Sequence, residues 1–416
     1  MEVRELAKKS NQAYHYFLEH GSGELKNRIL EVLANKLDIR RGELIAENRK
    51  DLAAGKEQGL SAAFIDRLTL NDAGIDGMIR SCREIIALND PVGKIDDLKV
   101  RPGGFRVGKM RVPIGVIAII YEARPNVTVE AAALCLKSGN AVILRGGSSA
   151  YHSNMALVSV LREALRENDV DEHLLSYLDS PERSAVDELL QQDDLIHLII
   201  PRGGEGLIRH VVEKSRIPVL KHYKGVCHVY VHEKADLPMA EKIILNAKVQ
   251  RPGVCNAAET LLVDAGIAGE FLPAALDALQ KAGVEIRGCE RTRAIYGSGV
   301  KPAGEKDYYA EFLDLILAVR IVDGLAAAVS HINKYGSAHT DAIITRDIDT
   351  ANAFIRNTDS ASVIVNASTR LADGSVYGLG AEIGISTDRL HARGPMGLEE
   401  LTSYKWIVLG EGQIRE

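Results

Sequence analysis

The sequence predicts an α/β protein with two doubly wound domains and a small β element. Short apolar runs alternate with helical patterns from about residue 115 onward, and each run ends in a turn signal. That alternation is typical of parallel sheets whose faces are covered by helices. A chain of 416 residues also exceeds one typical hydrophobic core, so more than one domain is expected.

The first 90 residues predict helices, because apolar positions recur every three or four residues in ELKNRILEVLANKL and IDGMIRSCREIIAL. A Gly- and Arg-rich stretch, RPGGFRVGKMRVPIG, follows. Its Pro-Gly-Gly turn and the alternation of Phe105, Val107 and Lys109 predict a β-hairpin or an exposed strand. The late segment SYKWIVLG predicts a strand that pairs with this hairpin or with another subunit.

Two sets of strands are expected between these segments. The first set, each strand followed by a predicted helix, consists of VIAIIYE (116–122), AVILRGG (141–147) and LIHLIIPRGG (195–204). The second set begins after residue 226 and consists of VCHVYVH, ETLLVD, LILAVRIVD, TDAIITRD and SASVIVN. They predict two α/β halves with a hinge near 220–260.

Composition argues against several classes of function. The net charge of −6 gives no reason to expect nucleic acid as a partner. No apolar run approaches the roughly 20 residues of a membrane span, and the charged N-terminus is not a secretory signal. The five cysteines lack C-x-x-C spacing and the twelve histidines lack H-E-x-x-H spacing, so no disulfide framework and no metal site are predicted. Reduced thiols suggest a cytoplasmic protein.

One cysteine differs from the other four. Cys255 lies in VQRPGVCNAAET directly after a Pro-Gly turn, where Arg251 and nearby backbone N–H groups would favour the thiolate. From these local features, a nucleophile and a bystander are equally good interpretations. The remaining thiols are interpreted as packing or bystander groups: Cys82, Cys135, Cys227 and Cys289.

Two Gly-rich turns connect a strand to a helix, an arrangement in which unpaired backbone N–H groups and the helix dipole face an anion. LIIPRGGEGLIRH supplies Gly203 and Gly204, and AVILRGGSSA supplies Arg145 and Gly146. The first is only half of a G-x-G-x-x-G motif, so a plain tight turn is the better interpretation of it alone. Two such turns in one α/β half favour a nucleotide phosphate site more than either does alone.

Basic residues gather in loops that flank these motifs, and together they indicate an anionic substrate. The candidates for holding it are Arg124, Lys221, Arg251 and Arg393. Each one taken singly is better interpreted as a solvated loop charge. His222 and His391 lie in the same loops and are interpreted as ordinary loop histidines, although an imidazole has the chemistry to move a proton.

Longer strings in these regions resemble one family. YEARPNVT, QRPGVCNA and HARGPMGLEELT are similar to the γ-glutamyl phosphate reductases, also called glutamate-5-semialdehyde dehydrogenases, of the aldehyde dehydrogenase superfamily. The resemblance covers nearly the whole chain from about residue 5. It implies NADPH-dependent reduction of L-glutamate 5-phosphate to glutamate 5-semialdehyde and phosphate through a cysteine thioester, the second step of proline biosynthesis from glutamate.

The resemblance also implies an aldehyde-dehydrogenase-like fold with three parts. A Rossmann-like cofactor domain is expected at 1–100 and 114–225, and a catalytic domain at 226–385. A hairpin at 101–113 and a C-terminal strand at 400–416 are expected to form an oligomerisation element. A homo-oligomer, either a dimer or a tetramer, is therefore expected.

Catalytic roles are implied for two residues. Cys255 matches the superfamily nucleophile, and Asn126 resembles the oxyanion-hole amide. Hydrolytic members share an E-L-G-G-K string whose glutamate activates water, whereas this chain reads LKHYKG at 220–225 and has no carboxylate there. Water is therefore not expected to take the acyl group, and Lys221 suits phosphate instead.

Cofactor roles follow in the same way. Arg145 stands where a lysine usually touches the adenosine ribose, and Glu311 resembles the glutamate that holds the nicotinamide ribose. The residues implied to contact NADP are Arg145, Gly146, Gly203, Gly204 and Glu311.

Three alternatives stay open. The first is another acylating member of the superfamily, which would use coenzyme A or a different acyl phosphate. A cysteine hydrolase or acyltransferase would pair Cys255 with His222, and a scaffold protein would need neither. Dinucleotide binding separates the enzyme of this superfamily from the last two. Because the resemblance accounts for the whole chain, the acyl phosphate is expected from a separate glutamate 5-kinase in a transient complex.

Overall fold

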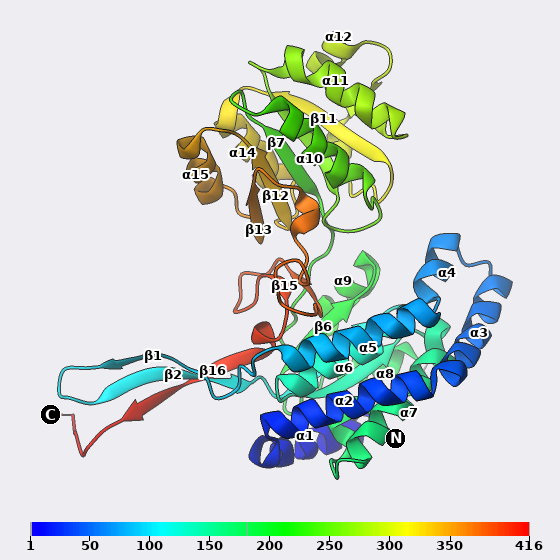
Figure 1. Cartoon of the computed structure of the whole chain (residues 1–416), viewed down its shortest axis with the longest axis vertical. Coiled ribbons are helices and arrows are strands. Elements are labelled where there is room, and N and C mark those ends of the chain that lie inside the picture. Colours follow the sequence, from blue (N-terminus) through cyan, green and yellow to red (C-terminus); the bar gives the residue numbers. More distant parts are fainter. Residues whose placement is uncertain (1, 181, 416) are drawn as a thin grey trace. The chain divides into compact units, whose positions relative to one another are not determined.

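The computed structural model describes residues 2–180 and 182–415. Residues 1, 181 and 416, which fall inside the predicted domain ranges, lie outside the described residues. The chain divides into two compact units (Figure 1). Unit 1 comprises Met1–Lys221, Gly378–Gly384 and Met396–Glu416, and unit 2 comprises His222–Tyr377 and Ile385–Pro395. The assignment of these units to cofactor and substrate remains a prediction.

Unit 1 begins with the helices that the apolar periodicity predicts. They are α1 (Val3–His20), α2 (Gly23–Ile39), α3 (Arg41–Glu57), α4 (Ala62–Leu68) and α5 (Asp72–Ala87). Ser22, Ser61 and Asn71 each start a helix, because their side chains accept a hydrogen bond from the backbone N–H three residues later. These caps explain why the helical region is divided at those points.

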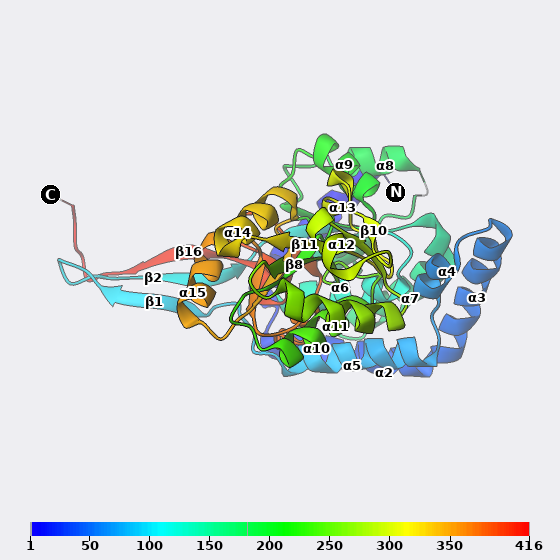
Figure 2. The same ribbon diagram turned by 90° about the horizontal axis from the view of Figure 1, so that it is seen from above.

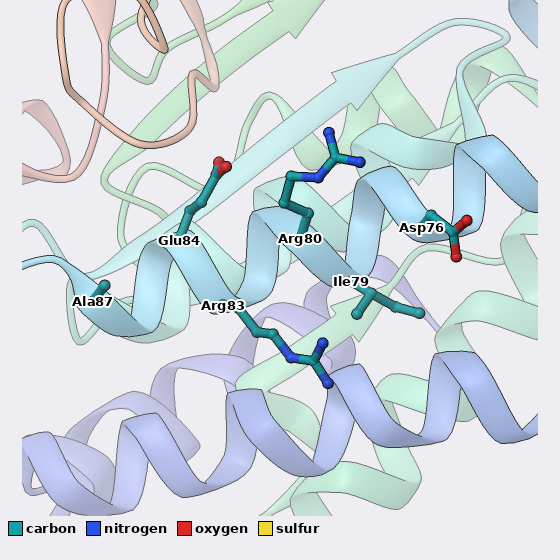
Figure 3. Close-up of a pocket in the computed structure, with 6 residues that line it drawn as sticks. All are labelled: Asp76, Ile79, Arg80, Arg83, Glu84 and Ala87. Carbon is teal, nitrogen blue, oxygen red and sulfur yellow. The ribbon is translucent and has the colours of Figure 1, made fainter.

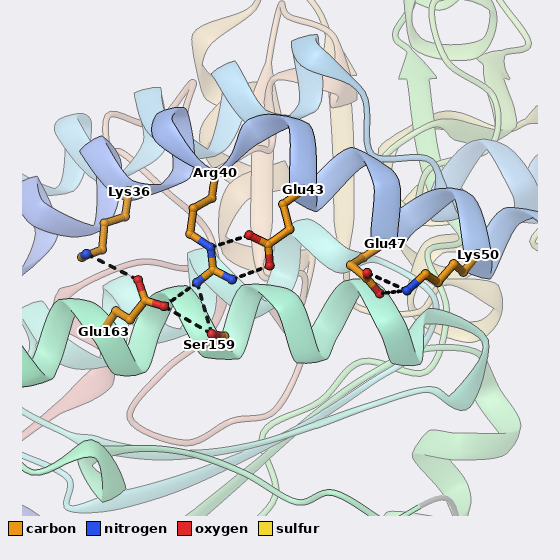
Figure 4. A network of polar contacts seen from close by, with 7 residues as sticks. All are labelled: Lys36, Arg40, Glu43, Glu47, Lys50, Ser159 and Glu163. Atoms are coloured by element: carbon orange, nitrogen blue, oxygen red, sulfur yellow. Dashed lines mark hydrogen bonds and ion pairs between the residues drawn. The ribbon is translucent and has the colours of Figure 1, made fainter.

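Ion pairs connect α2 and α3 to α7 (Tyr151–Arg166), as Figure 4 shows. Arg40, at the junction of α2 and α3, places guanidinium nitrogens 2.6 Å from carboxylate oxygens of both Glu43 and Glu163. Lys36 lies 3.4 Å from Glu163. Partly exposed pairs of this kind typically contribute less than about 1 kcal/mol each, so the buried apolar faces hold these helices together.

The sheet of unit 1 is parallel and has the strand order β5-β4-β3-β6. Its strands are β3 (Val116–Tyr121), β4 (Ala141–Gly146), β5 (Leu175–Tyr177) and β6 (Leu198–Arg202). The connecting helices are α6 (Pro125–Lys137), α7, α8 (Arg183–Leu189) and α9 (Glu205–Lys214). Right-handed crossovers place α6 and α7 on one face and α8 and α9 on the other, because the chain returns past β3 to reach β6.

A separate three-stranded antiparallel sheet projects from the helices of unit 1 in both views (Figures 1 and 2). Its order is β1 (Ile95–Val100), β2 (Arg106–Pro113) and β16 (Thr402–Leu409). The predicted pairing of the late strand with the hairpin is confirmed, since β16 pairs with β2 along its whole length. The hairpin starts at Ile95, earlier than the predicted 101–113, because Gly103 and Gly104 have positive φ and make the turn.

Unit 2 contains a seven-stranded parallel sheet with the order β10-β9-β11-β8-β7-β12-β13. Its strands are β7 (Cys227–Val231), β8 (Ala258–Asp264), β9 (Glu285–Gly288), β10 (Lys301–Pro302), β11 (Ile316–Val322), β12 (Thr340–Ile344) and β13 (Ser362–Val365). Five of these strands confirm the second predicted set. The short strands β9 and β10 were not predicted.

Helices cover both faces of this sheet, as a doubly wound arrangement requires. Val229, Leu261 and Val263 face a core formed with α10 (Leu237–Val249) and α11 (Ala268–Lys281). The alternate residues Tyr230 and Leu262 face a second core with α14 (Gly324–Tyr335) and α15 (Ile348–Asn357). The predicted pair of α/β halves is therefore confirmed.

The remaining elements are short. They are α12 (Glu290–Tyr296), α13 (Glu305–Tyr308), a two-stranded sheet of β14 (Gly384–Ser386) with β15 (Gly394–Met396), and the 3₁₀ helices Ser148–Ala150, Glu172–Leu174, Thr369–Leu371 and Glu399–Leu401. Among the described residues, no helix combines the length and the apolar character needed to cross a membrane.

Candidate active site

Several loops of unit 2 end at the same edge of its sheet. Gly225, Cys255 and His339 come just before β7, β8 and β12, and Glu311 lies in the loop that leads into β11. Because these strands are parallel, their amino ends meet at one edge of the sheet. The topology therefore gathers residues that are far apart in the sequence around the cysteine that the sequence singled out.

The backbone of Cys255 is tightly held. Cys255 is partly exposed and lies in the turn between α10 and β8, where the N–H of Ala257 donates to the carbonyl of Val254 at 3.0 Å. The thiol of Cys227 donates to the Cys255 carbonyl oxygen at 3.1 Å. A Cβ placed on Gly225 would lie 1.8 Å from that same oxygen. Only glycine fits at 225, and the contact fixes where the Cys255 side chain begins.

Replacing Gly225 with alanine is expected to disrupt the site. The added methyl group forces the Cys255 carbonyl away, and overpacking of this kind costs about 1–3 kcal/mol or more. A displacement near 1 Å at a nucleophile lowers the rate on the order of 100-fold. Urea unfolding and kcat measure the two effects. Gly77→Ala is the matched control, because no atom lies within 4 Å of the position its Cβ would take. Equal free energies of unfolding and equal kcat values for the Gly225→Ala and Gly77→Ala variants would contradict the expectation.

Two imidazoles lie beside the thiol. One ring nitrogen each of His222 and His339 and the Sγ of Cys255 all lie within 4.8 Å of one another. The Nδ1 of His222 lies 2.9 Å from the carbonyl oxygen of Ile385, which can only accept, so Nδ1 carries the proton. The Nδ1 of His339 lies 2.9 Å from the hydroxyl of Thr340. Sequence reasoning interpreted His222 as an ordinary loop residue and kept a Cys255–His222 pair only as an alternative. It missed His339, whose one signal is its place directly before a buried strand.

A guanidinium that the sequence did not suggest also faces this region. Arg370 lies in the 3₁₀ helix Thr369–Leu371 and donates from Nε to the side-chain oxygen of Gln250 at 2.8 Å. It also donates to the side chain of Asn256, the neighbour of Cys255. Burial lowers the pKa of Arg370, and the negative charge of a Cys255 thiolate acts in the opposite direction. The charge of Arg370 therefore lies close enough to Cys255 for the two groups to interact.

Glu311 is fixed by its own hydrogen bond and by the loop that carries it. Its Oε1 accepts from the N–H of Gly225 at 2.7 Å. Two residues later, the N–H of Leu313 donates to Glu259 at 3.2 Å. Glu259 in turn forms a fully buried ion pair with Lys248 at 2.6 Å. Burial raises the pKa of Glu259 to about 7 and lowers that of Lys248. A buried ion pair thus supports the loop that holds Glu311.

The predicted anion-binding residues of unit 2 differ in what they contact. Arg251 is exposed in the turn of Cys255. Arg393 donates to the Asp359 carboxylate at 2.8 Å and to the Asp359 carbonyl at 3.1 Å. Arg251 is therefore accessible to an anion, whereas Arg393 would have to give up part of an ion pair. Lys224, in the same loop as His222, donates to the carbonyl of Tyr309 at 2.7 Å.

In unit 1, the predicted substrate residue Arg124 and the predicted oxyanion donor Asn126 lie at the start of α6. Arg124 is exposed at the N-terminal boundary of the helix, and Asn126 lies in its first turn. The Nδ2 of Asn126 donates to Glu130 at 3.1 Å, so this amide is engaged along its own helix. Lys221 is half-buried at the last residue of the longest segment of unit 1.

The predicted cofactor residues of unit 1 lie at the carboxyl end of β4 (Arg145 and Gly146) and directly after β6 (Gly203 and Gly204), on either side of β3. A Cβ on Gly146 would lie 2.1 Å from the side chain of Asn154, and a Cβ on Gly203 would lie 2.6 Å from that of Glu122, so a larger residue at either position would have to displace a neighbouring side chain. The N–H of Gly204 donates to the Glu122 carboxylate at 3.0 Å. This carboxylate therefore takes a donor at the start of α9 that an anionic ligand would otherwise use.

Hollows elsewhere on the molecule do not include the predicted site residues. A groove of about 480 Å³ runs along α5 (Figure 3) and is lined by Asp76, Ile79, Arg80, Arg83, Glu84 and Ala87. A second hollow of about 510 Å³ lies beside α14, with Cys289 and His331 among its lining residues. Neither hollow is lined by Cys255 or by another predicted site residue, so the edge around Cys255 stays the candidate site.

Comparison with known proteins identifies the family. A model of the aldehyde dehydrogenase family matches residues 5–293. The chain is 55% identical over 420 residues to a γ-glutamyl phosphate reductase of Thermodesulfovibrio yellowstonii, with 100% of both proteins covered. The chain belongs to the γ-glutamyl phosphate reductases of the aldehyde dehydrogenase family. The resemblance inferred from YEARPNVT and QRPGVCNA is confirmed.

Solved structures agree with this assignment. The crystal structure of the γ-glutamyl phosphate reductase from Thermotoga maritima is 49% identical and superposes with a TM-score of 0.97, with 100% of both chains covered. An acetylating aldehyde dehydrogenase from Geobacillus thermoglucosidasius superposes with a TM-score of 0.71 at 18% identity, a likeness that shows the fold alone. The predicted aldehyde-dehydrogenase-like fold is therefore confirmed for this γ-glutamyl phosphate reductase family member. Membership also implies an oxidoreductase that uses a nicotinamide cofactor.

Proposed function

We propose that this protein reduces L-glutamate 5-phosphate to glutamate 5-semialdehyde and phosphate with NADPH, a step of proline biosynthesis. The observation that carries the proposal is the 55% identity to a γ-glutamyl phosphate reductase over the full length of both chains. The geometry of unit 2 supports it, because a partly exposed thiol lies beside two imidazoles and a guanidinium.

Cys255 is the nucleophile in this proposal. An imidazole within 4.8 Å accepts the thiol proton, and Arg370 stabilises the resulting thiolate. The sulfur attacks the acyl carbon, the bond from that carbon to the phosphate oxygen breaks, and phosphate leaves. The product is a thioester, whose carbonyl is more electrophilic than a carboxylate and whose thiolate is a good leaving group. After reduction of this carbonyl, the thiolate departs and the semialdehyde is released.

Two donors are proposed to stabilise the negative charge that develops on the acyl oxygen. They are the backbone N–H of Cys255 and the side-chain amide of Asn126. The amide would have to exchange its hydrogen bond with Glu130, and burial raises the pKa of that carboxyl group. Loss of one such donor typically lowers a rate about 100- to 1000-fold.

The residues around the cofactor turns fit a phosphorylated dinucleotide. When bound, NADPH supplies the hydride that the thioester carbonyl accepts. Arg145 and Arg183 lie close enough for their charges to interact, and burial lowers the pKa of Arg145. Two guanidinium groups beside a Gly turn suit the 2′-phosphate that distinguishes NADP from NAD. Glu311 would hold the nicotinamide ribose, and Gly203 and Gly204 would allow close approach of the pyrophosphate.

Replacing Arg145 with glutamine is expected to raise the KM for NADP⁺ about 10- to 100-fold, because a hydrogen bond between charged groups is worth roughly 1.5–3 kcal/mol. The KM for NAD⁺ should change much less, since NAD⁺ lacks the 2′-phosphate. Arg166→Gln, on the exposed end of α7, is the matched control. Equal increases for NADP⁺ and NAD⁺ in the Arg145 variant would show that Arg145 does not bind the 2′-phosphate.

For the substrate, we assign the phosphate and the α-carboxylate to Arg124, Lys221, Arg251 and Arg393. Arg251 has the best support, because it is exposed in the turn that carries Cys255. Arg393 has the least, because its guanidinium is paired with Asp359. A dianionic substrate suits this basic set better than coenzyme A does.

The deciding experiment is the reverse reaction. NADP⁺ reduction by the purified protein is followed with glutamate 5-semialdehyde in the presence and absence of inorganic phosphate. Turnover that requires phosphate supports the proposal. Turnover without phosphate would mean that water takes the acyl group, which would overturn the phosphorylating reaction. Absence of turnover in a protein that binds NADPH would overturn the proposed substrate.

The substrate is a labile acyl phosphate, so we further propose that it comes from a separate glutamate 5-kinase through a transient complex in the cytosol. The projecting sheet of β1, β2 and β16 would join subunits into a homo-oligomer. A coupled assay of kinase and reductase with an added acyl-phosphate trap tests the transfer. A rate that the trap leaves unchanged supports a complex, and a rate that it fully suppresses argues against one.

A further inference from the structure

The thiol and the two imidazoles at the edge of the unit 2 sheet form a set of ligands suited to a metal ion. His222, Cys255 and His339 each offer one ligand atom, and these three atoms lie within 4.8 Å of one another. They come from three separate loops, before β7, β8 and β12. Because His339 is buried and His222 and Cys255 are partly exposed, an ion from solvent would reach the set from the side of the thiol.

Both imidazoles already have the supporting contacts that metal-binding histidines require. In metal sites, the ring nitrogen that does not bind the metal typically donates its N–H to a carboxylate, a backbone carbonyl or water, and a hydroxyl oxygen can accept in the same way. Here the Nδ1 of His222 faces the Ile385 carbonyl at 2.9 Å, and the Nδ1 of His339 faces the Thr340 hydroxyl at 2.9 Å. The Nδ1 of His339 also lies 3.8 Å from the Sγ of Cys227. With Nδ1 engaged in these contacts, Nε2 is the nitrogen left to each ring for a metal.

A tetrahedral zinc site sets the separation that the three ligand atoms must reach. Zn–S bonds of about 2.3 Å and Zn–N bonds of about 2.05 Å place the ligand atoms of such a site about 3.3–3.6 Å apart. The separations here extend to at most 4.8 Å, so binding of an ion requires the partly exposed side chains of His222 and Cys255 to move inward. The ligands are one sulfur and two imidazoles without a carboxylate, a combination that favours Zn²⁺ and disfavours Mg²⁺ or Ca²⁺.

We propose that His222, Cys255 and His339 bind one Zn²⁺, with water in the fourth position, and that this ion reversibly inhibits the enzyme. A Zn–S bond forms, the thiol proton is released to solvent, and the sulfur is no longer available to attack an acyl carbon. The inhibition rests on the proposed role of Cys255 as the nucleophile, whereas the binding does not. The positive charge of Arg370 opposes a dication, so the affinity is that of a reversible site and not of a permanent structural one.

Metal binding can be measured without catalysis. Wild-type protein is titrated with Zn²⁺ against a chromophoric chelator, and separately with Co²⁺ as a spectroscopic substitute. We expect one Zn²⁺ per chain, and a Co²⁺ complex with a thiolate-to-cobalt charge-transfer band. Cys255→Ser should remove that band, and His222→Gln should weaken Zn²⁺ binding about 100-fold. His20→Gln, at an exposed histidine of α1, is the matched control and should bind as wild type does.

His339→Gln should weaken binding similarly, and His222→Gln keeps the test decisive if the buried substitution impairs folding. Zn²⁺ should also slow alkylation of Cys255 by iodoacetamide. Binding unchanged by His222→Gln and Cys255→Ser, or a cobalt spectrum without a sulfur band, would overturn the site. Phosphate-dependent turnover that Zn²⁺ leaves unaffected would overturn the inhibition. Cys255-dependent metal binding in a protein without turnover would retain the site while the proposed function fails.

Discussion

Replacing Cys255 with serine is expected to lower kcat for phosphate-dependent NADP⁺ reduction on the order of 10⁴-fold or more, as loss of a nucleophile does in other enzymes. A serine hydroxyl is far less ionised than a thiol near neutral pH, so it is a much weaker nucleophile. The assay uses glutamate 5-semialdehyde, phosphate and NADP⁺. NADPH binding, followed by its fluorescence, should stay unchanged, which separates lost chemistry from lost folding.

Cys289→Ser is the matched control for this experiment. Cys289 is also a partly buried thiol of unit 2, and its sulfur lies 3.3 Å from the hydroxyl of Thr292. It precedes α12 and is not part of the cluster around Cys255. We expect this variant to retain most of the activity. A Cys255→Ser variant with activity similar to that of the control would exclude Cys255 as the nucleophile.

Replacing Lys248 with methionine is expected to lower the free energy of unfolding by about 3–5 kcal/mol, because removal of one partner leaves a buried carboxyl group without its counterion. Lys248 and Glu259 are both fully buried and their charged atoms lie 2.6 Å apart. Urea unfolding measures the change. We also expect a lower kcat, because Glu259 holds the loop that carries Glu311 through its bond to Leu313.

Two further variants test the cause of this loss. The double variant Lys248→Met with Glu259→Leu should recover most of the stability, since neither buried charge remains. Lys334→Met removes a comparable ion pair with Glu305, but both of those side chains are more than half exposed, so little change is expected. A Lys248 variant no less stable than the Lys334 variant would show that the buried pair does not stabilise unit 2.

Local patterns predicted the fold well where elements are long and apolar. Strand β3 and the first four residues of β4 are fully buried, so they appear in the sequence as continuous apolar runs, VIAIIY and AVIL, followed by turns. Strands β5, β9 and β10 were not predicted, because LSY, EIRG and KP are too short or too polar to form such a run. Their pairing depends on neighbouring strands that the local sequence does not reveal.

The candidate site was harder to predict from local sequence than the fold was. Cys255 was visible because a Pro-Gly turn precedes it within four residues. His339 and Arg370 were not, because only the order of the parallel strands brings their loops to the thiol. The spacing rules that predicted no metal site examine ligands close together in the sequence, and a set divided among three loops escapes them. The roles assigned to Cys255, Asn126 and the cofactor residues remain predictions.

The three-stranded sheet can form only after β16 has been synthesised, because β16 is one of its strands. β16 forms the outer strand beside β2, and Leu401, just before it, accepts a hydrogen bond from the buried Asn140. A ribosome releases these residues only after all of unit 2 has been translated. The β1–β2 hairpin therefore lacks its third strand until the residues between β2 and β16 have been translated. A nascent chain without β16 cannot present the finished three-stranded surface, so assembly through it would be restricted to chains in which β16 has been translated.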